Sequence, residues 1–252
     1  MTDKSTEIHM LDHKVRLYQP EEGFRTSMDA VLLAAACPAV NAQNVLDIGC
    51  GVGGASFCLL YREPELRVTG IDIREEYIHI ADRNKQLNEH ESRSVFRVQA
   101  IEDFRVKNPH ERFDHIICNP PFYEAGEHLP SPVEGLAMAR GHGNTAITLK
   151  DWVDCAFFNL KSKGSFTIIH QAEKMDVILR DMGKRFGATE IIPIYTKAGR
   201  PAKRVIIRAY KDRLTPLVLQ PAVYLEDLDG QQTKDAHFLL REGYSFDRLY
   251  QK

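Results

Sequence analysis

Short apolar runs and stretches of helical period alternate along most of the chain. An apolar run of strand length followed by an amphipathic stretch of helix length is typical of a strand and the helix that covers it. Repetition of this unit predicts an α/β fold with a parallel, doubly wound sheet. The predicted strands lie at residues 44–48, 66–71, 94–99, 113–118, 163–170, 189–195 and 204–210, and the predicted helices at 24–34, 55–61, 75–88, 148–160 and 174–186.

The two ends of the chain depart from this alternation. Residues 189–195 and 204–210 have no helix between them, so we predict that they are antiparallel neighbours. Residues 1–25 carry few apolar positions, and a short helix near residues 233–241 is the main element expected after the last strand. We predict a single domain over residues 1–252, with an N-terminal segment and helix at 1–40, a core at 41–211 and a C-terminal tail at 212–252.

The composition is that of an ordinary globular protein, because 43% of the 252 residues are hydrophobic and 27% are charged. No signal peptide is visible, and the longest apolar run, residues 30–36, is too short to span a bilayer. Five cysteines without a CxxC pair indicate free thiols in a reducing compartment, and no His/Cys cluster has metal-ligand spacing. We therefore expect a cytoplasmic location, no membrane and no metal.

Four residues follow the apolar run at 113–118 directly, and they are Asn119, Pro120, Pro121 and Phe122. Ligands of a parallel α/β sheet lie just outside the carboxyl ends of its strands. Two prolines remove two N–H donors and hold the backbone stiff, so this corner offers hydrogen-bond acceptors and an aromatic ring. Such a corner suits a planar group with an NH2, and we predict that it holds the amino group of a base for methylation. A rigid turn at the strand end is the alternative.

A mechanism follows from these residue types. The Asn119 side-chain oxygen and the Pro120 carbonyl can both accept a hydrogen bond from the amino group, while Phe122 stacks on the base. The amino nitrogen then directs its lone pair at the methyl donor, and positioning supplies most of the rate. No strong base is needed for this reaction, and the sequence offers no evident one.

A glycine-rich turn, residues 49–54, follows the first predicted core strand. Its glycines allow a ligand to approach the backbone, and the next helix directs its N-terminal amides at that ligand. Gly49, Gly51 and Gly54 also satisfy the spacing of a dinucleotide fingerprint. However, Asp47 precedes the turn, and its carboxylate would repel a pyrophosphate and attract an ammonium or sulfonium. The turn therefore favours S-adenosylmethionine over NAD, and a purely structural turn is the third interpretation.

Asp72 ends the second core strand about 20 residues after the glycine turn, where an acidic side chain can accept hydrogen bonds from ribose hydroxyls. Its alternative role is to cap the helix that follows. We expect the cofactor adenine to lie against residues 100–103 at the end of the third strand. Whether Glu102 or Asp103 points inward is left open.

Basic residues gather between positions 197 and 213, against a single acid, Asp212. On a hairpin near the substrate cleft they could bind phosphates, whereas on a sheet edge they could prevent pairing with another sheet. Arg140, in the long polar stretch 123–144, is a further candidate for a phosphate contact. The basic residues of the hairpin segment are Lys197, Arg200, Lys203, Arg204, Arg208, Lys211 and Arg213.

Taken together, these segments resemble class I S-adenosylmethionine-dependent methyltransferases. Residues 119–122 resemble the Asn-Pro-Pro-Phe/Tyr motif of amino-group methyltransferases. More narrowly, the chain resembles the bacterial tRNA1(Val) (adenine-37-N6)-methyltransferase family over most of residues 15–250. The segments that carry this likeness are residues 24–33, 47–51, 119–122, the pair Ala139-Arg140 and residues 200–205.

The resemblance implies a Rossmann-like α/β fold with a seven-stranded, mostly parallel sheet whose last strand is antiparallel. It implies N6-methylation of an adenine in RNA, favouring a tRNA anticodon loop. The alternatives left open are a protein glutamine N5-methyltransferase of the release-factor type, a DNA adenine methyltransferase and a catalytically silent RNA-binding protein. The predicted catalytic residues are Asn119, Pro120, Pro121 and Phe122; the predicted cofactor contacts are Thr26, Asp29, Asp47, Gly49, Gly51, Asp72, Ile73, Ile101, Glu102 and Asn119; and the predicted RNA contacts are Arg140, Lys203 and Arg204.

Overall fold

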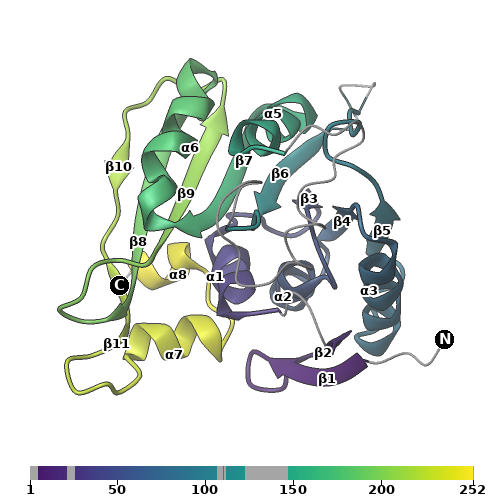
Figure 1. Cartoon of the computed structure of the whole chain (residues 1–252), viewed down its shortest axis with the longest axis horizontal. Coiled ribbons are helices and arrows are strands. Elements are labelled where there is room, and N and C mark those ends of the chain that lie inside the picture. The colour runs from purple at the N-terminus through teal and green to yellow at the C-terminus, as the bar shows by residue number, and fades with distance from the viewer. Residues whose placement is uncertain (1–4, 22–25, 107–109, 111, 123–146, 252) are drawn as a thin grey trace.

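The structure is a computed structural model that describes residues 5–21, 26–106, 110, 112–122 and 147–251. A central sheet lies between two layers of helices (Figure 1). On one face, the core includes side chains of α1 (Met28–Ala36), α2 (Gly54–Arg62) and α3 (Glu75–Leu87). On the other face, it includes side chains of α5 (Leu149–Asn159) and α6 (Met175–Met182). The strands between them are therefore buried on both sides, which explains their continuous apolar runs.

Seven strands form the body of the sheet, in the order β8-β9-β7-β6-β3-β4-β5. All neighbours in this order are parallel except β9, which is antiparallel to both β7 and β8. The predicted mostly parallel arrangement with an antiparallel last strand is thus confirmed for these seven strands, to which the tail adds two more. The strands are β3 (Asn44–Ile48), β4 (Arg67–Asp72), β5 (Ser94–Val98), β6 (Phe113–Cys118), β7 (Leu160–Gln171), β8 (Phe186–Lys197) and β9 (Arg204–Lys211).

The C-terminal tail adds elements that the sequence pattern did not predict. Two short strands, β10 (Val218–Leu219) and β11 (Val223–Glu226), pair in parallel with β8. The predicted helix near 233–241 is confirmed as α7 (Lys234–Leu240), with Thr233 as its N-cap, and a second helix, α8 (Phe246–Tyr250), follows. Both helices pack on the same face as α1, through Leu239 and Phe246. Their anchoring positions are too few to give a clear period in the sequence.

An N-terminal hairpin is a second element that the sequence did not reveal. Strands β1 (Ser5–Met10) and β2 (Val15–Pro20) form a separate antiparallel sheet. Leu11, Asp12 and His13 turn the chain with positive φ angles and no glycine, so turn chemistry gives no signal. The Asn84 amide of α3 binds the Tyr18 backbone, with distances of 2.6 Å to its N–H and 2.9 Å to its carbonyl. Tertiary contacts therefore hold this hairpin in place.

The end of α6 corrects a prediction. The helix stops at Met182, and Gly183 is its C-cap with φ +53°, whereas the helix predicted from the sequence extends to residue 186. A short 3-10 turn, Gly183–Arg185, then leads into β8, and another, Ala172–Lys174, precedes α6. Gly187 lies inside β8, where an added Cβ would come within 2.1 Å of the Arg213 carbonyl oxygen. Its role is to permit close backbone approach in the sheet.

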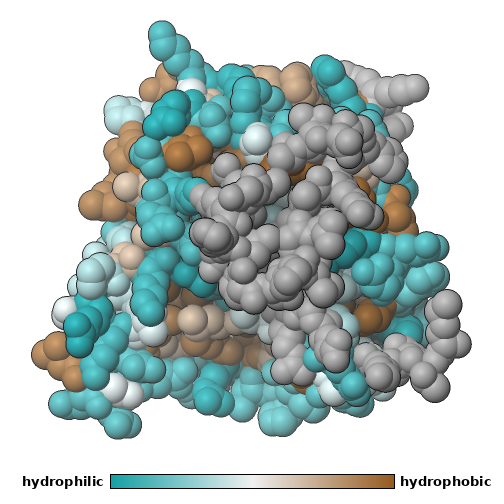
Figure 2. Space-filling model, in the orientation of Figure 1, coloured by the Kyte–Doolittle hydropathy of each residue, from teal (hydrophilic) through white to brown (hydrophobic). Residues whose placement is uncertain are grey.

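The surface of one face is mainly hydrophilic where it is described, and its apolar side chains form small separate patches (Figure 2). One group of exposed apolar side chains, Leu214, Val218 and Leu219, lies in and beside β10. All five cysteines are buried free thiols, as their apolar neighbours predict. Within the described ranges, no helix has the length and apolarity needed to cross a bilayer.

Candidate functional site

The carboxyl ends of neighbouring strands bring the predicted site residues to one edge of the sheet. Ile48 of β3 pairs with Ile71 of β4 and with Cys118 of β6. The residues that follow these three are Gly49, Asp72 and Asn119, so the glycine turn, the acidic side chain and the proline corner start side by side. Parallel register alone produces this meeting, because every strand in this part of the sheet ends in the same direction.

The glycine turn needs its glycines for conformation and for packing. Gly49, Gly51 and Gly53 have φ angles of +68°, +53° and +90°, a region that other residues rarely adopt. A Cβ at Gly49 would lie 2.6 Å from the Trp152 ring of α5. A Cβ at Gly54 would lie 2.5 Å from the Thr26 methyl group, so Thr26 packs directly on the turn. The turn is therefore held from both faces of the sheet.

Asp47 lies one residue before the end of β3, and its side chain is buried. The Ser56 hydroxyl on α2 donates a hydrogen bond to Asp47 Oδ2 at 2.7 Å. Burial raises the pKa of Asp47 to about 7, and nearby Asp72 also raises it, while the bond from Ser56 lowers it. A cation bound at this position would favour the charged carboxylate, and the attraction of Asp47 for an ammonium or sulfonium stays a prediction.

Asp72 connects the end of β4 to both neighbouring turns. Its Oδ2 accepts from the Gly51 N–H and its Oδ1 from the Arg74 N–H, both at 2.9 Å. Burial raises the pKa of Asp72, and the Arg74 and Gly51 hydrogen bonds oppose this shift. The bond to Arg74, the N-cap residue of α3, shows that Asp72 helps to start that helix. The carboxylate keeps lone pairs for further donors, so the ribose role stays a prediction.

The predicted adenine contacts differ in exposure. Ile73 is 41% exposed, an apolar side chain left open directly after Asp72. Ile101 is buried and belongs to the core on the α5 side of the sheet. Glu102 and Asp103 are both exposed.

Asn119 has a buried polar atom at this edge of the sheet. Its side-chain oxygen, Oδ1, is buried and has no hydrogen-bond partner in the described part of the chain. A buried acceptor without a donor costs about 1–3 kcal/mol, so such atoms are rare unless a ligand supplies the donor. The carboxyl end of β6 therefore presents, beside two prolines, an acceptor that no described residue uses.

Phe122 lies against two side chains from other strands. The Arg204 guanidinium carbon is 4.3 Å from the centre of the Phe122 ring, and the His170 ring meets Phe122 edge to face, with 5.4 Å between ring centres. Arg204 also donates from Nε to Asp29 Oδ2 at 3.1 Å, which ties α1 to this corner. The other oxygen, Asp29 Oδ1, is buried and finds no donor among the described residues. Asp29 and Arg204 thus belong to one cluster.

The structure corrects the phosphate-binding role considered for the basic residues between positions 197 and 213. Arg208 is buried, and its guanidinium binds both carboxylate oxygens of Glu190 and of Asp247. Lys211 is also buried and donates to the backbone carbonyls of Phe157 and Leu160. Neither can contact a phosphate, so a phosphate-binding role is wrong for these two residues.

Three other basic residues of this segment lie near the edge of the site. Arg200 and Lys203 are exposed in the connection between β8 and β9, which starts at the carboxyl end of β8. Arg204 is half-buried at the start of β9 and is already paired with Asp29. Arg140 lies outside the described residues.

Three further residues support the site, although the sequence did not single them out for it. Ser56 binds Asp47, Trp152 packs on Gly49, and His170 contacts Phe122. Only His170 carried a readable signal, because it stands at the end of a predicted strand. Ser56 and Trp152 come from helices that reach the site through packing, and helical period does not indicate which turn faces a ligand.

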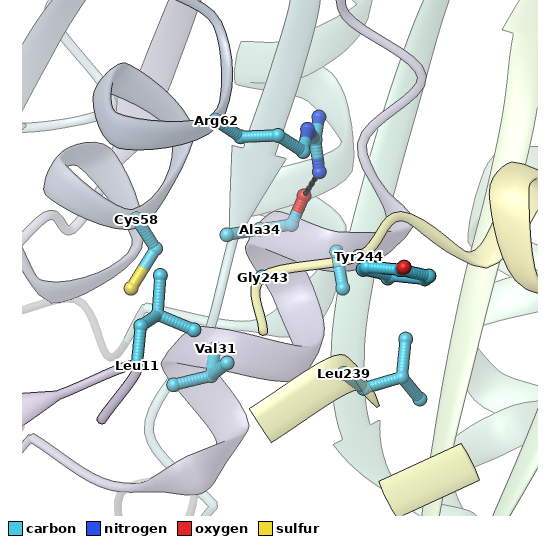
Figure 3. Close-up of a pocket in the computed structure, with 9 residues that line it drawn as sticks. Leu11, Val31, Ala34, Cys58, Arg62, Leu239, Gly243 and Tyr244 are labelled. Atoms are coloured by element: carbon cyan, nitrogen blue, oxygen red, sulfur yellow. Dashed lines mark hydrogen bonds between the residues drawn. The ribbon is translucent and has the colours of Figure 1, made fainter. Parts of the chain in front are cut away.

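A small pocket lies elsewhere in the molecule (Figure 3). Leu11, Val31, Cys58 and Leu239 line it, between the N-terminal hairpin, α1, α2 and the tail. Arg62 donates to the Ala34 carbonyl beside it at 2.6 Å. None of the predicted site residues lines this pocket, which marks where the tail packs on α1 and α2. No group of three or more His, Cys, Asp or Glu suited to a metal occurs in the ranges that the structure describes.

Comparison with known proteins shows which family model matches this chain. The model of the methyltransferase small domain family matches residues 27–195. A protein of Shewanella sediminis is 34% identical over 107 residues, which are 41% of this chain and 43% of that protein. One of Shewanella baltica is 26% identical over 225 residues, 88% of this chain and 92% of that protein. Both are named tRNA1(Val) (adenine(37)-N6)-methyltransferase.

The chain covers these relatives to different extents. The matched parts are 43%, 66% and 63% of the length of three such relatives, from Shewanella sediminis, Shewanella woodyi and a Flavobacteriaceae bacterium. Among solved structures, a predicted O-methyltransferase from Agrobacterium tumefaciens has a TM-score of 0.69 at 23% identity, covering 86% of this chain and 97% of its own. M. jannaschii TYW2 in complex with AdoMet has a TM-score of 0.57 at 14% identity, covering 85% and 89%. At these identities the likeness shows the fold alone.

Proposed function

Because this chain belongs to the methyltransferase small domain family, we propose that it methylates the N6 amino group of an adenine in tRNA with S-adenosylmethionine as donor. One observation carries the proposal: Oδ1 of Asn119, at the edge where the glycine turn and Asp72 also lie, is buried and has no hydrogen-bond partner among the described residues. That oxygen is prepared for an N–H that the described protein does not supply. An amino group held there lies next to the predicted cofactor site.

The residues at the ends of β3 and β4 fit the cofactor. The left-handed Gly49 and Gly51 present backbone without a Cβ, and Asp72 has acceptor capacity left for ribose hydroxyls. Asp47, whose pKa burial raises to about 7, is stabilised as a carboxylate by a nearby cation such as an amino-acid ammonium. When bound, S-adenosylmethionine supplies an activated methyl group.

The proline corner fits the acceptor. The adenine amino group is a poor nucleophile because its lone pair is delocalised into the ring. Asn119 Oδ1 accepts one of its N–H groups and the Pro120 carbonyl can accept the other, which orients the nitrogen and favours a localised lone pair. Arg204 already lies over the Phe122 ring, so a base that stacks on Phe122 uses another part of the ring surface or displaces the guanidinium.

The relatives' names support tRNA as the acceptor and adenine 37 of tRNA1(Val) as the position. The match to the Shewanella baltica protein, which covers nearly the whole of both chains, carries most weight. An unpaired loop base costs less to withdraw from its stack than a paired one. Arg200 and Lys203, exposed next to the site, are the residues that we assign to the RNA backbone.

The test is transfer of labelled methyl groups by the purified protein into total tRNA from a strain that lacks it. We expect label in N6-methyladenosine after digestion to nucleosides, and in tRNA1(Val) when single transcripts are compared. A tRNA1(Val) transcript with guanosine in place of adenosine 37 is the matched control and should stay unlabelled. Label in a release-factor glutamine or in DNA, with none in RNA, would replace this proposal with the corresponding alternative.

A further inference from the structure

His170, near the end of β7, has two buried ring nitrogens, and neither makes a hydrogen bond of normal geometry to a described residue. The residue is 1% exposed. Leaving buried polar atoms without partners costs about 1–3 kcal/mol for each group, so folding alone does not explain this histidine. Unsatisfied groups of this kind occur where a ligand completes the network.

His115 shows how the same fold treats a structural histidine. It is also buried, at 8% exposure, near the opposite end of the neighbouring strand β6. Its Nδ1 pairs with the Ser165 hydroxyl at 2.7 Å and its Nε2 with Gln43 Oε1 at 2.8 Å. Both ring nitrogens of His115 are therefore satisfied. The contrast places the unsatisfied histidine at the functional edge and the satisfied one away from it.

The position of His170 relative to the proline corner follows from the register. Cys118 of β6 pairs with Ile168 of β7, so Asn119 and His170 leave adjacent strands at the same edge. The His170 ring meets the Phe122 ring at an interplanar angle of 83°. Asn119 Oδ1 and both nitrogens of His170 are thus buried polar atoms without a hydrogen bond of normal geometry to any described residue, and both residues belong to the edge where Phe122 lies.

The protonation state decides what His170 can offer. Burial lowers the pKa of His170 to about 4, the Pro121 backbone opposes this shift, and Lys174 and Arg204 favour it. At neutral pH the imidazole is uncharged and has one N–H donor and one acceptor. Asn119 Oδ1, in contrast, can only accept. The corner therefore offers an acceptor for an amino group together with a neutral donor.

We propose that His170 is a specificity-determining residue whose N–H donates to the ring nitrogen bonded to the amino-bearing carbon of the acceptor base. In adenine that atom is N1, an acceptor next to the amino group that Asn119 holds. The corresponding ring nitrogen of guanine carries a hydrogen and would oppose the His170 N–H, so guanine is rejected. This inference rests on the proposed function, because it concerns the same acceptor site.

The experiment removes the acceptor nitrogen from the base and the imidazole donor from the protein. Anticodon stem–loops of tRNA1(Val) that carry adenosine or 1-deazaadenosine at position 37 are methylated by the wild-type protein and by His170→Phe. We expect the 1-deaza substitution to lower kcat/KM about tenfold or more in the wild type, and much less in His170→Phe. For each protein, kcat/KM with adenosine is divided by kcat/KM with 1-deazaadenosine, and the wild-type value is then compared with that of His170→Phe. This comparison cancels the intrinsic change in amine reactivity, which is the same for both proteins.

Further variants separate specificity from folding. His170→Asn, which retains an N–H and an acceptor, should recover part of the discrimination that His170→Phe loses. His170→Phe should unfold at the same temperature as the wild type or higher, since it removes unsatisfied polar atoms. An equal 1-deaza penalty in the wild type and His170→Phe overturns the inference while the proposed function stands. Failure of the wild type to methylate both the adenosine stem–loop and full-length tRNA1(Val) overturns both.

Discussion

The guanidinium of Arg204 lies over the ring of Phe122, with 4.3 Å from its central carbon to the ring centre. Arg204 begins β9, and Phe122 follows β6, so residues 82 positions apart in the sequence meet at one edge of the sheet. Because Arg204 is also paired with the buried Asp29, this contact links α1 and the last strand to the proline corner. The predicted RNA contact at Arg204 is therefore engaged inside the protein.

Arg204→Met should destabilise the protein by about 1–3 kcal/mol, because it leaves the Asp29 carboxylate buried and uncompensated. The double variant Asp29→Asn with Arg204→Met should be more stable than Arg204→Met alone, since no unpaired charge remains. Urea unfolding of the two single variants and the double variant measures the coupling. If the two substitutions are simply additive, the ion pair does not stabilise this corner.

Asn119→Ala should retain cofactor binding and lose methyl transfer by a factor of about 100 or more, as for a removed transition-state acceptor. The acceptor Oδ1 is buried at the end of β6, whereas the predicted cofactor contacts of β3 and β4 stay intact. Calorimetric titration with S-adenosylmethionine and a single-turnover assay measure the two properties. Turnover near the wild-type rate would remove the central role of Asn119.

Asp47 should make stability depend on pH. Its pKa is raised by burial to about 7 in the folded protein and is about 3.9 in an unfolded chain, so the folded state binds more protons between these values. This contribution is present below pH 4 and is lost as the pH rises through 7. Relative to the wild type, Asp47→Asn should therefore gain stability from pH 5 to 8, by up to roughly 4 kcal/mol. Urea unfolding at several pH values without cofactor tests the slope.

The same carboxyl group gives an opposite pH effect on ligand binding. A bound cation favours the charged form, so affinity for S-adenosylmethionine should increase as the pH rises through 7. Asp47→Asn should bind more weakly and lose this dependence, and Ser56→Ala serves as a variant that keeps the charge. A pH-independent affinity in the wild type would place the cation of the ligand away from Asp47.

Gly49→Ala should destabilise the protein by about 2 kcal/mol or more, since it combines a left-handed φ with overpacking against Trp152. Gly199→Ala is the matched control, because Gly199 also has a positive φ, +77°, but its added Cβ would meet Leu228 only at 3.4 Å. Thermal or urea unfolding compares the two. Equal losses would show that conformation alone accounts for the effect at Gly49.

Replacement of Arg200 and Lys203 by Glu should weaken RNA binding and flatten its salt dependence, by about one unit of log–log slope for each phosphate that is no longer neutralised. Both side chains are exposed in the β8–β9 connection. Lys163→Glu with Lys184→Glu makes the same charge change at exposed positions near the amino ends of β7 and β8, away from the site. A salt slope equal in both double variants would argue that the hairpin residues only protect a sheet edge.

The sequence by itself determined the mostly parallel sheet and the edge at which the predicted site residues meet. Strand runs that are buried on both faces are apolar throughout, and the carboxyl ends of parallel strands must share an edge, so the sequence alone is enough to group Asp47, Asp72 and Asn119. These properties depend on local pattern, which the sequence records directly.

Only the tertiary structure decided which polar side chains are free for a ligand. Arg208 and Lys211 look like surface cations in the sequence but are bound to acceptors supplied by distant segments. His170 looks ordinary in the sequence, yet its ring nitrogens are buried and have no hydrogen-bond partner in the part that the structure describes. Whether a polar atom is satisfied depends on which segments pack around it, and that is a property of the fold as a whole.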